Sequence, residues 1–333
     1  MTSRAPLLIV IPCLNEEAHL PGLLQWLATE CPHDPIVVAD GGSTDRSRDV
    51  VTAFAAGHAN VHLIDNPRRI QSAGINRAAA LLGDGCEWLL RIDAHCLYPA
   101  GYARELLRAA RERRATSVVV PMVSRGHGCF QRAAAAAQNS VLGTGGSPHR
   151  HLGHGRLVDH GHHALMRLDL FRAVGGYRED MPHNEDAELD LRLLAAGGRI
   201  WLEPGQALVY FPRGTPRGLW RQYFGYGTGR ARTLLLHRTR PKMRQLAPLA
   251  VAGAAGLALL SPIHAAFAAP LALWALLSLV AGMAIGMRAG GGCAMLAGVA
   301  AMIMHSAWSL GFLRGVFAGS GRPPHQQAAI AQE

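Results

Sequence analysis

The sequence predicts an α/β domain with a mostly parallel sheet, followed by a hydrophobic anchor of C-terminal transmembrane helices. The first observation is that short β-rich apolar runs alternate with segments of helical spacing over the first 125 residues. The second is that no Asp, Glu, Lys or Arg lies between Arg244 and Arg288, and that the next charged residue is Arg314. At 333 residues, the chain has the length of about two domains.

Five apolar runs are the expected strands of the sheet. They lie at residues 7–11, 36–39, 61–64, 88–92 and 117–123. Apolar residues between them recur at helical spacing, and helices are therefore expected at residues 20–27, 47–56, 72–82 and 102–113. Strands that alternate with helices form a mostly parallel sheet, and ligands bind such sheets beyond the carboxyl ends of the strands. Polar residues at those ends are therefore the candidate site residues.

The middle of the chain has a different composition. Residues 126–162 are rich in Gly and His, which predicts an irregular loop rather than a core element. Further structure is expected at residues 171–176, 186–196, 200–202 and 208–211. The histidines of this region are His149, His151, His154, His160, His162 and His163. A metal cluster is one interpretation of them, but they lack tight ligand spacing, so a solvated loop on the acceptor side is preferred.

The net charge of +10 is concentrated before the apolar tail. Nine Arg and Lys residues lie within the basic connector 213–244, and no acidic residue occurs between Glu203 and Glu333. The connector leads into an anchor at residues 245–318, with about three spans expected at 246–266, 269–287 and 292–313 and a tail at 319–333. The positive-inside rule then places a domain of residues 1–240 on the cytoplasmic side of the inner membrane. Buried helices of a soluble domain are disfavoured by the length of these runs, and a nucleic-acid arm by the lack of any matching fold signature.

The cysteines and the N-terminus indicate a reducing compartment. The six cysteines are scattered and include no C-x-x-C pair, which argues against a disulfide framework and against a structural zinc site. The apolar run at residues 7–11 is short and is broken by Pro12, so it predicts a first strand and not a signal peptide.

Polar motifs follow the first two expected strands. Residues 12–17 read Pro-Cys-Leu-Asn-Glu-Glu, and residues 39–45 read Ala-Asp-Gly-Gly-Ser-Thr-Asp. A carboxylate followed by glycines at a strand end lets a nucleoside approach the backbone, so Asp40 is a candidate to bind a base or a ribose. Taken alone, such a run is more often a simple turn.

The fourth expected strand ends in a candidate metal site. Residues 91–95 read Arg-Ile-Asp-Ala-His, and the alternation of a strand points Asp93 and His95 to the same side. A carboxylate with an imidazole suits Mn²⁺ well and Mg²⁺ less well. An aspartate at a strand end beside an unrelated histidine is the alternative.

A third acidic motif predicts a general base. Asn184 is expected to cap a helix, which places Glu185 and Asp186 in its first turn. The helix dipole stabilises negative charge there and keeps a carboxylate ionised, as a general base requires. Acidic residues that simply favour a helix start are the alternative, and this reading fits Glu188 and Asp190 well.

Together these motifs resemble glycosyltransferase family 2 and, within it, the succinoglycan-biosynthesis ExoA-like proteins. The resemblance covers roughly residues 6–235, and the five motifs occur in the same order. It rests on residues 12–17, 40–45, 93–95, 175–177 and 184–186. Features typical of the ExoA-like subgroup are residues 91–95 with 98–99, 143–147, 158–159 with 162–163, and 222–227.

The resemblance implies a GT-A fold, a Rossmann-like arrangement, and inverting sugar transfer. By this resemblance, the donor-binding residues would be Pro12, Asn15, Glu17, Asp40, Gln71 and Asp93. Asp93 and His95 would hold a divalent metal ion, Mn²⁺ or Mg²⁺, on the diphosphate, and Asp186 would take the proton of the acceptor hydroxyl. The acceptor-side candidates are His162, His163, Glu185, Gln222 and Arg230.

The sequence departs from the family pattern in two places. His95 stands where most relatives have the second Asp of Asp-x-Asp, and Gln71 stands where many have Lys. Arg68 or Arg69 is the candidate to replace the contact of that Lys. The Gln-x-x-Arg-Trp signature of processive polymer synthases is absent, which favours the addition of a single sugar.

The sequence therefore predicts a membrane glycosyltransferase that moves one sugar from a nucleotide-diphosphate donor, preferably UDP-linked, to a lipid-linked saccharide in polysaccharide biosynthesis. An anchor would hold the site close to a substrate confined to the membrane. Three alternatives remain: transfer directly to polyprenyl phosphate, a non-catalytic membrane scaffold with a nucleotide-binding fold, and a transport component. No nucleic-acid partner is expected.

Overall fold

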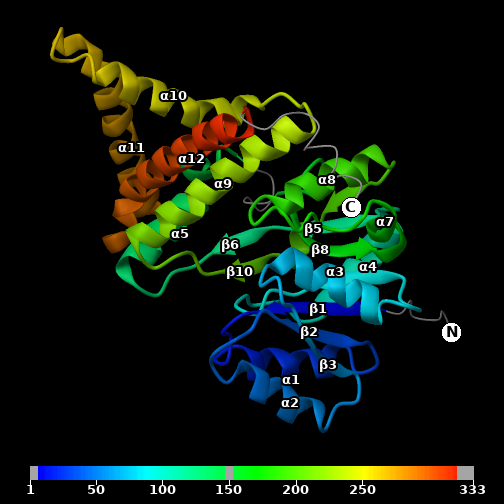
Figure 1. Cartoon of the computed structure of the whole chain (residues 1–333). Coiled ribbons are helices and arrows are strands. Elements are labelled where there is room, and N and C mark those ends of the chain that lie inside the picture. The colour runs from blue at the N-terminus through cyan, green and yellow to red at the C-terminus, as the bar shows by residue number, and fades with distance from the viewer. Residues whose placement is uncertain (1–6, 147–152, 321–333) are drawn as a thin grey trace. The chain divides into compact units, whose positions relative to one another are not determined.

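The computed structural model describes residues 7–146 and 153–320, which separate into two compact units. The first unit is Met1–Val123 with His151–Tyr210, and the second is Ser124–Arg150 with Phe211–Glu333. The chain thus enters the second unit twice (Figure 1). This division does not follow the expected border at residue 240, which concerned the membrane and stays a prediction.

The first unit contains the predicted α/β sheet. Its strands are β1 (Leu7–Cys13), β2 (Ile36–Asp40), β3 (Val61–Asp65), β4 (Trp88–Arg91), β5 (Ser117–Val120), β7 (Arg156–Val158), β8 (His162–Arg167) and β9 (Ile200–Leu202). Its helices are α1 (Leu20–Glu30), α2 (Ser47–Ala55), α3 (Gln71–Leu82), α4 (Tyr102–Glu112), α7 (Leu168–Ala173) and α8 (Glu185–Ala195), with a 3₁₀ turn, η2 (Pro204–Gln206). These bounds confirm most of the expected elements to within a few residues.

The strand order of the eight-stranded sheet is β3-β2-β1-β4-β8-β5-β9-β7. Strands β1 to β4 are parallel, with Ile9 of β1 opposite Ile36 of β2 and Leu90 of β4. The carboxyl ends of β1, β2 and β4 therefore meet at one edge. The run predicted as one strand at 117–123 divides at Pro121 into β5 and β6 (Met122–Ser124), because proline cannot donate to a ladder, and β6 pairs with β10 (Leu208–Tyr210).

The prediction of an irregular loop at residues 126–162 was wrong in part. It contains β7 and a helix of the second unit, α5 (Cys129–Gln138), and it ends where β8 begins. Strand β8 lies inside the sheet, antiparallel to both β4 and β5. Its apolar part, residues 164–166, is fully buried, but it is too short to stand out after a Gly- and His-rich stretch.

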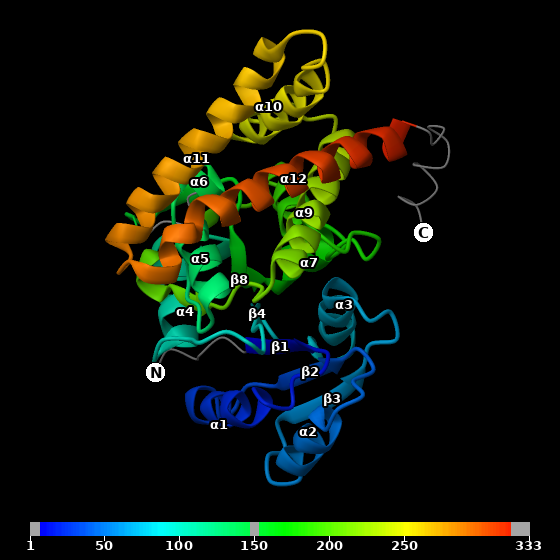
Figure 2. The same ribbon diagram turned by 90° about the vertical axis from the view of Figure 1, so that its left-hand side faces the viewer.

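The sheet is covered on both faces, as the alternation of strands and helices in the sequence predicted. In β1, Leu7, Ile9 and Ile11 pack on one side with residues of α1 and α4. Leu8 and Val10 point the other way and pack with residues of α3, α7 and α8. Figure 2 shows α1 and α3 on opposite sides of the sheet. With both faces covered by helices, the polar side chains after the strands gather at the sheet edge.

The second unit is helical. Its elements are α5, α6 (Val141–Thr144), α9 (Pro216–Leu236), α10 (Met243–Ala258), η3 (Ala265–Ala268), α11 (Ala269–Arg288), η4 (Gly292–Leu296) and α12 (Ala297–Ser320). The basic segment predicted as a connector is largely the helix α9, which lies along α12 (Figure 1). Glycines allow this approach: a Cβ atom on Gly227 would lie 2.0 Å from the carbonyl oxygen of Trp308, and one on Gly311 would lie 2.0 Å from that of Phe224.

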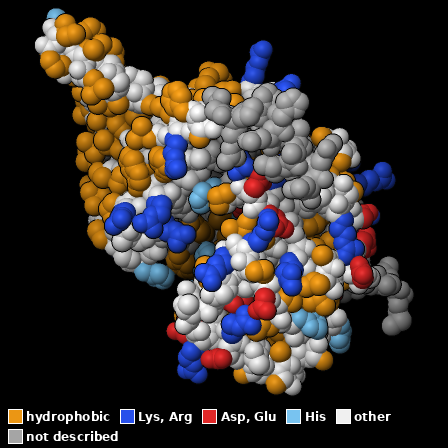
Figure 3. Space-filling view, viewed as in Figure 1, with side chains coloured by type: hydrophobic (Ala, Val, Ile, Leu, Met, Phe, Trp, Pro, Cys, Tyr) orange, Lys and Arg blue, Asp and Glu red, His pale blue; other side chains and the backbone are white. Residues whose placement is uncertain are grey.

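Two helical segments of the described chain are long and apolar enough to cross a membrane, Ala265–Arg288 and Gly292–Ala318. The first of the three expected spans corresponds to a shorter apolar helix, Gln245–Ala258. Leu273, Leu276 and Leu277 of α11 are more than half exposed. Figure 3 shows the resulting hydrophobic surface over the C-terminal helices.

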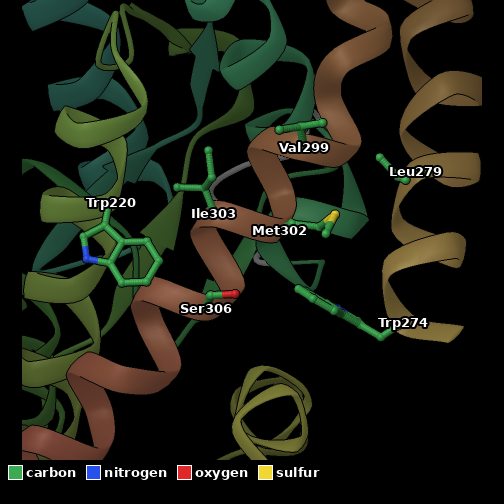
Figure 4. Close-up of a pocket in the computed structure, with 7 residues that line it drawn as sticks. All are labelled: Trp220, Trp274, Leu279, Val299, Met302, Ile303 and Ser306. Carbon is green, nitrogen blue, oxygen red and sulfur yellow. The ribbon is translucent and has the colours of Figure 1, made fainter. Parts of the chain in front are cut away.

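The second unit also holds an apolar groove of about 330 Å³, to which α9, α11 and α12 contribute (Figure 4). It is lined by Trp220, Trp274, Leu279, Val299, Met302, Ile303 and Ser306. In the same unit, a disulfide joins Cys129 to Cys293, although the scattered cysteines suggested a reducing compartment and no disulfide framework. The two residues are 164 positions apart, so no local spacing in the sequence indicates the pair.

Candidate active site

The loops after β1 and β2 are joined by hydrogen bonds around the Asn15 and Ser43 side chains. The Asn15 backbone N–H donates to Ser43 Oγ (2.9 Å), and Asn15 Oδ1 accepts from the Thr44 N–H (2.8 Å). Asn15 adopts a left-handed conformation (φ 57°), which asparagine tolerates better than most residues. Asn15, a predicted donor-binding residue, therefore shapes the two loops by its own contacts.

Asp40 lies buried at the end of β2 and accepts hydrogen bonds from its own loop. Ser43 Oγ donates to Asp40 Oδ1 (2.5 Å), the Gly42 N–H donates to Oδ2 (3.1 Å), and Arg48 pairs with Oδ2 (2.8 Å). Burial raises the pKa of Asp40, but the hydrogen bonds from Ser43 and Arg48 outweigh burial, so its pKa is lowered. The carboxylate is thus ionised and orients the Gly-Gly-Ser backbone.

The other two predicted residues of this region are placed as follows. Glu17 Oε2 accepts from the Arg46 N–H (2.8 Å) at the start of α2, and Glu17 is exposed. Pro12 lies half-buried within β1, opposite Ala39 of β2. Their contact with a nucleotide stays a prediction.

Asp93 follows β4 and is held by three other residues. Its Oδ1 accepts from Gln71 Nε2 (3.1 Å) and from Arg91 Nε (3.1 Å), while its backbone N–H donates to the Tyr98 hydroxyl (2.7 Å). Burial would raise the pKa of Asp93, but the charge of Arg91 dominates the opposing effects and lowers it to about 2. Gln71, predicted at a donor-contact position, therefore lies directly beside the candidate metal ligand.

The buried Arg91 joins the two acidic motifs. Its Nη1 pairs with Asp186 Oδ1 (2.7 Å), and Asp186 Oδ1 also accepts from the Tyr177 hydroxyl (2.9 Å). Burial disfavours a charged Arg91, yet the charges of Asp186 and Asp93 hold its pKa well above the usual value. Asp93 and Asp186, which lie far apart in the sequence, thus share one guanidinium.

His162 lies between the same two carboxylates on their other oxygens. Its Nε2 is 3.5 Å from Asp93 Oδ2, and its Nδ1 is 3.9 Å from Asp186 Oδ2. Asp93, Arg91, Asp186 and His162 therefore form a closed ring of charged and polar groups. His162, an acceptor-side candidate, lies at the start of β8, and its contact with an acceptor stays a prediction.

His95 is oriented by a carboxylate that the sequence analysis did not select. Its Nδ1 lies 3.0 Å from Glu16 Oε1, and Glu16 Oε2 lies 2.8 Å from His19 Nδ1. Burial would raise the pKa of Glu16, but its contacts with His95 and then His19 lower it. The sequence did not single out Glu16, because it stands beside Glu17 in a motif of two acidic residues.

Glu185 and Asp186 begin α8, as predicted, and Asn184 occupies the capping position. Asn184, however, is in a left-handed conformation (φ 64°), and its side chain makes no cap hydrogen bond. Burial raises the pKa of Glu185 to about 7, and the charge of Asp186 adds to this. The helix start therefore carries a carboxyl that is partly protonated near neutral pH.

This pKa predicts a pH-dependent effect of Glu185→Gln on stability. A carboxyl whose pKa is higher in the folded chain than its ordinary value of 4.5 weakens the fold as pH rises from about 4.5 to about 7. The variant should therefore be more stable than the wild type at pH 8, by no more than about 3 kcal/mol, and equal to it at pH 4.5. Urea unfolding of both chains in detergent at the two pH values measures this; an equal gain at both pH values would contradict the assignment.

Two of the remaining predicted residues belong to the second unit. Gln222 and Arg230 lie on α9 in the second unit, and Gln222 Nε2 donates to the Tyr226 hydroxyl (3.0 Å). The side chain of His163 lies outside the described residues. Arg91 and Tyr177 were quoted only as parts of motifs, because nothing local in the sequence indicates that both contact Asp186.

The donor set fits a divalent metal ion that is shared with a ligand. An ionised carboxylate, Asp93, and an imidazole, His95, are close enough that the charge of His95 lowers the pKa of Asp93. Within residues 7–146 and 153–320, no group of three or more His, Cys, Asp or Glu side chains is arranged to hold a metal ion. The other ligands would therefore be oxygens of a bound diphosphate and water, which suit a hard divalent cation.

Comparison with known proteins agrees with this arrangement. The family model of glycosyl transferase family 2 matches residues 8–175. The chain is 50% identical over 311 residues to the succinoglycan biosynthesis protein ExoA of Rhizobium meliloti (strain 1021), covering 92% of this chain and 94% of that protein.

Two solved structures share the fold. The mannosyltransferase PcManGT from Pyrobaculum calidifontis, in complex with GDP-Man and Mn²⁺, matches with a TM-score of 0.66 at 18% identity, over 95% of this chain and 88% of that one. GalNAc-T7 with UDP, GalNAc and Mn²⁺ matches with a TM-score of 0.51 at 13% identity, over 70% and 48% of the two chains. The predicted GT-A fold is confirmed, and the chain belongs to glycosyltransferase family 2.

Proposed function

We propose that this enzyme transfers one sugar, with inversion, from a nucleoside-diphosphate sugar to a lipid-linked saccharide in exopolysaccharide biosynthesis. The observation that carries the proposal is the ring in which Asp93 and Asp186 share Arg91 and both approach His162. It brings a candidate metal ligand and a candidate base to one place. The name of the half-identical relative, a succinoglycan biosynthesis protein, supports the pathway class.

In this mechanism Asp186 is the general base. Its Oδ1 accepts from Arg91 and Tyr177, and its Oδ2, on the side of His162, is the oxygen that would take the proton of the acceptor hydroxyl. The hydroxyl oxygen would then form its bond to the anomeric carbon as the bond to the diphosphate breaks. Arg91 and Tyr177 keep the carboxylate oriented during this step, and orientation contributes strongly to rate.

The donor side is built from the loops after β1, β2 and β4. Asp93 and His95 would hold the divalent ion, which when bound neutralises the charge that develops on the departing diphosphate. Gln71 and Arg91 fix Asp93 for this role. Asp40 would act on the nucleoside through the loop that it orients, and a UDP-sugar is the first donor to test.

The acceptor proposal rests on the second unit. Its two long apolar segments support membrane association, with the catalytic unit proposed to face the cytoplasm. The apolar groove would suit a hydrocarbon chain. On α9, Arg217 and Arg221 lie one helical turn apart on either side of Trp220, where cations would suit a lipid phosphate.

The proposal predicts that transfer depends on a metal ion, and one assay tests it. Membranes that contain the full chain are given UDP- and GDP-sugars with a lipid extract or with polyprenyl phosphate alone. We expect sugar incorporation into the lipid extract with Mn²⁺, and a loss of at least about a hundredfold on chelation, because several kcal/mol of charge stabilisation disappear. Product with polyprenyl phosphate alone would mean that polyprenyl phosphate, and not a lipid-linked saccharide, is the acceptor. Full activity in chelator would contradict the role of the metal ion.

A further inference from the structure

Glu16 is placed to act on His95, the residue that departs from the usual Asp-x-Asp pattern. Its Oε1 is 3.0 Å from Nδ1 of His95, and its Oε2 is 2.8 Å from Nδ1 of His19. The Glu16 side chain is only 16% exposed, whereas His95 is 47% exposed. The carboxylate is therefore a fixed partner beneath a more accessible imidazole.

This contact decides which ring nitrogen can bind a metal ion. A carboxylate that accepts from Nδ1–H fixes the imidazole in the tautomer whose lone pair is on Nε2. Histidines that bind metals usually have such a carboxylate or carbonyl on the other nitrogen, which orients the ring and raises its basicity. His95 has this arrangement, and Glu16 comes from a different loop, after β1.

The contact also restores charge. Relative to an Asp-x-Asp pair, a site of Asp93 and a neutral His95 lacks one negative charge. Glu16 supplies that charge one layer behind the imidazole, where it still attracts a cation. The nitrogen ligand remains, however, and imidazole favours Mn²⁺ over the harder Mg²⁺.

We propose that Glu16 is a positioning residue that holds His95 through Nδ1, so that the Glu16–His95 pair takes the place of the second Asp and makes the site selective for Mn²⁺. The inference rests on the proposed metal-dependent transfer. Glu16 does not itself bind the ion or the sugar in this account. His19 fixes the second oxygen of the carboxylate and has a smaller, supporting role.

The test compares Glu16→Gln, His95→Asp and the double variant in the full chain purified in detergent. Mn²⁺ binding is measured by electron paramagnetic resonance with UDP, or with GDP if the wild type binds only that. Glu16→Gln should weaken Mn²⁺ binding by about 10- to 100-fold, the scale of losing a carboxylate partner of a metal-bound histidine. Glu112→Gln, on the exposed end of α4, is the matched control and should bind Mn²⁺ normally.

The metal preference gives a second readout. His95→Asp should raise the ratio of Mg²⁺- to Mn²⁺-supported activity by at least about tenfold, because it restores two oxygen ligands. Adding Glu16→Gln to that variant should weaken Mn²⁺ binding far less than it does in the wild type, since its partner is gone.

Three outcomes would overturn the inference. The first is unchanged Mn²⁺ binding in Glu16→Gln, and the second is an effect of Glu16→Gln on Mn²⁺ binding that is equal with and without His95. The third is that Glu16→Gln weakens nucleotide binding in chelator as much as it does with Mn²⁺ present, which would make Glu16 a nucleotide contact. Failure of the proposed function is distinguishable, because Mn²⁺ binding is measured without sugar transfer. Thermal unfolding of each variant shows whether it is folded.

Discussion

Replacing Asp186 with Asn should lower kcat by at least about a hundredfold while changing Mn²⁺ and nucleotide binding little. The amide keeps the size of the carboxylate and still accepts from Arg91 and Tyr177 through its oxygen, but it cannot take a proton. Because the acceptor hydroxyl would then attack without a base, the loss should fall on kcat rather than on KM. Initial rates at varied acceptor concentration measure this.

Two comparison variants make the result specific. Asp84→Asn changes an exposed aspartate on the same unit, 94% accessible, and should keep wild-type turnover. Tyr177→Phe removes one of the two hydrogen bonds to Asp186 Oδ1 and should have an intermediate effect. A wild-type kcat in Asp186→Asn would mean that another group is the general base, and Glu185 would be the next carboxyl to test.

The sequence predicted the part of the site that depends on strand ends. Parallel strands bring their carboxyl ends to one edge, so Asp40 and Asp93 follow from strand assignment alone. The start of α8 at Glu185 was also predicted from a local signal, an asparagine at the capping position, although its side chain makes no cap hydrogen bond. Local patterns therefore located the segments after β2 and β4 and the start of α8.

The parts that were missed depend on contacts between distant residues. Arg91 and Asp186 are separated by 95 positions, and Glu16 and His95 by 79. The antiparallel β8, which brings His162 to the centre of the site, follows a stretch whose composition indicates a loop. The role of an arginine within a buried strand becomes evident only when its two partners are located in space.

The strongest expected effect on stability comes from that arginine. Arg91→Leu removes the guanidinium that Asp93 and Asp186 share, and it leaves two mostly buried carboxylates beside His162. Breaking a buried ion pair by removing one partner typically costs about 3–5 kcal/mol, so we expect a large fall in the denaturation midpoint together with loss of transfer activity. Urea unfolding of the full chain in detergent measures it.

The pH dependence separates this electrostatic cause from lost packing. With Arg91 present, the lowered pKa of Asp93, about 2, contributes stability above the unfolded pKa and loses it only as pH falls through 2. Without Arg91 both carboxyls should protonate more readily, so the deficit of Arg91→Leu should shrink between pH 7 and pH 4. Adding Asp93→Asn and Asp186→Asn to Arg91→Leu should recover much of the stability at pH 7, because no unpaired charge remains. A deficit that is equal at both pH values, and unchanged by the two amides, would mean that Arg91 acts through the packing of its aliphatic stem and not by joining the two carboxylates.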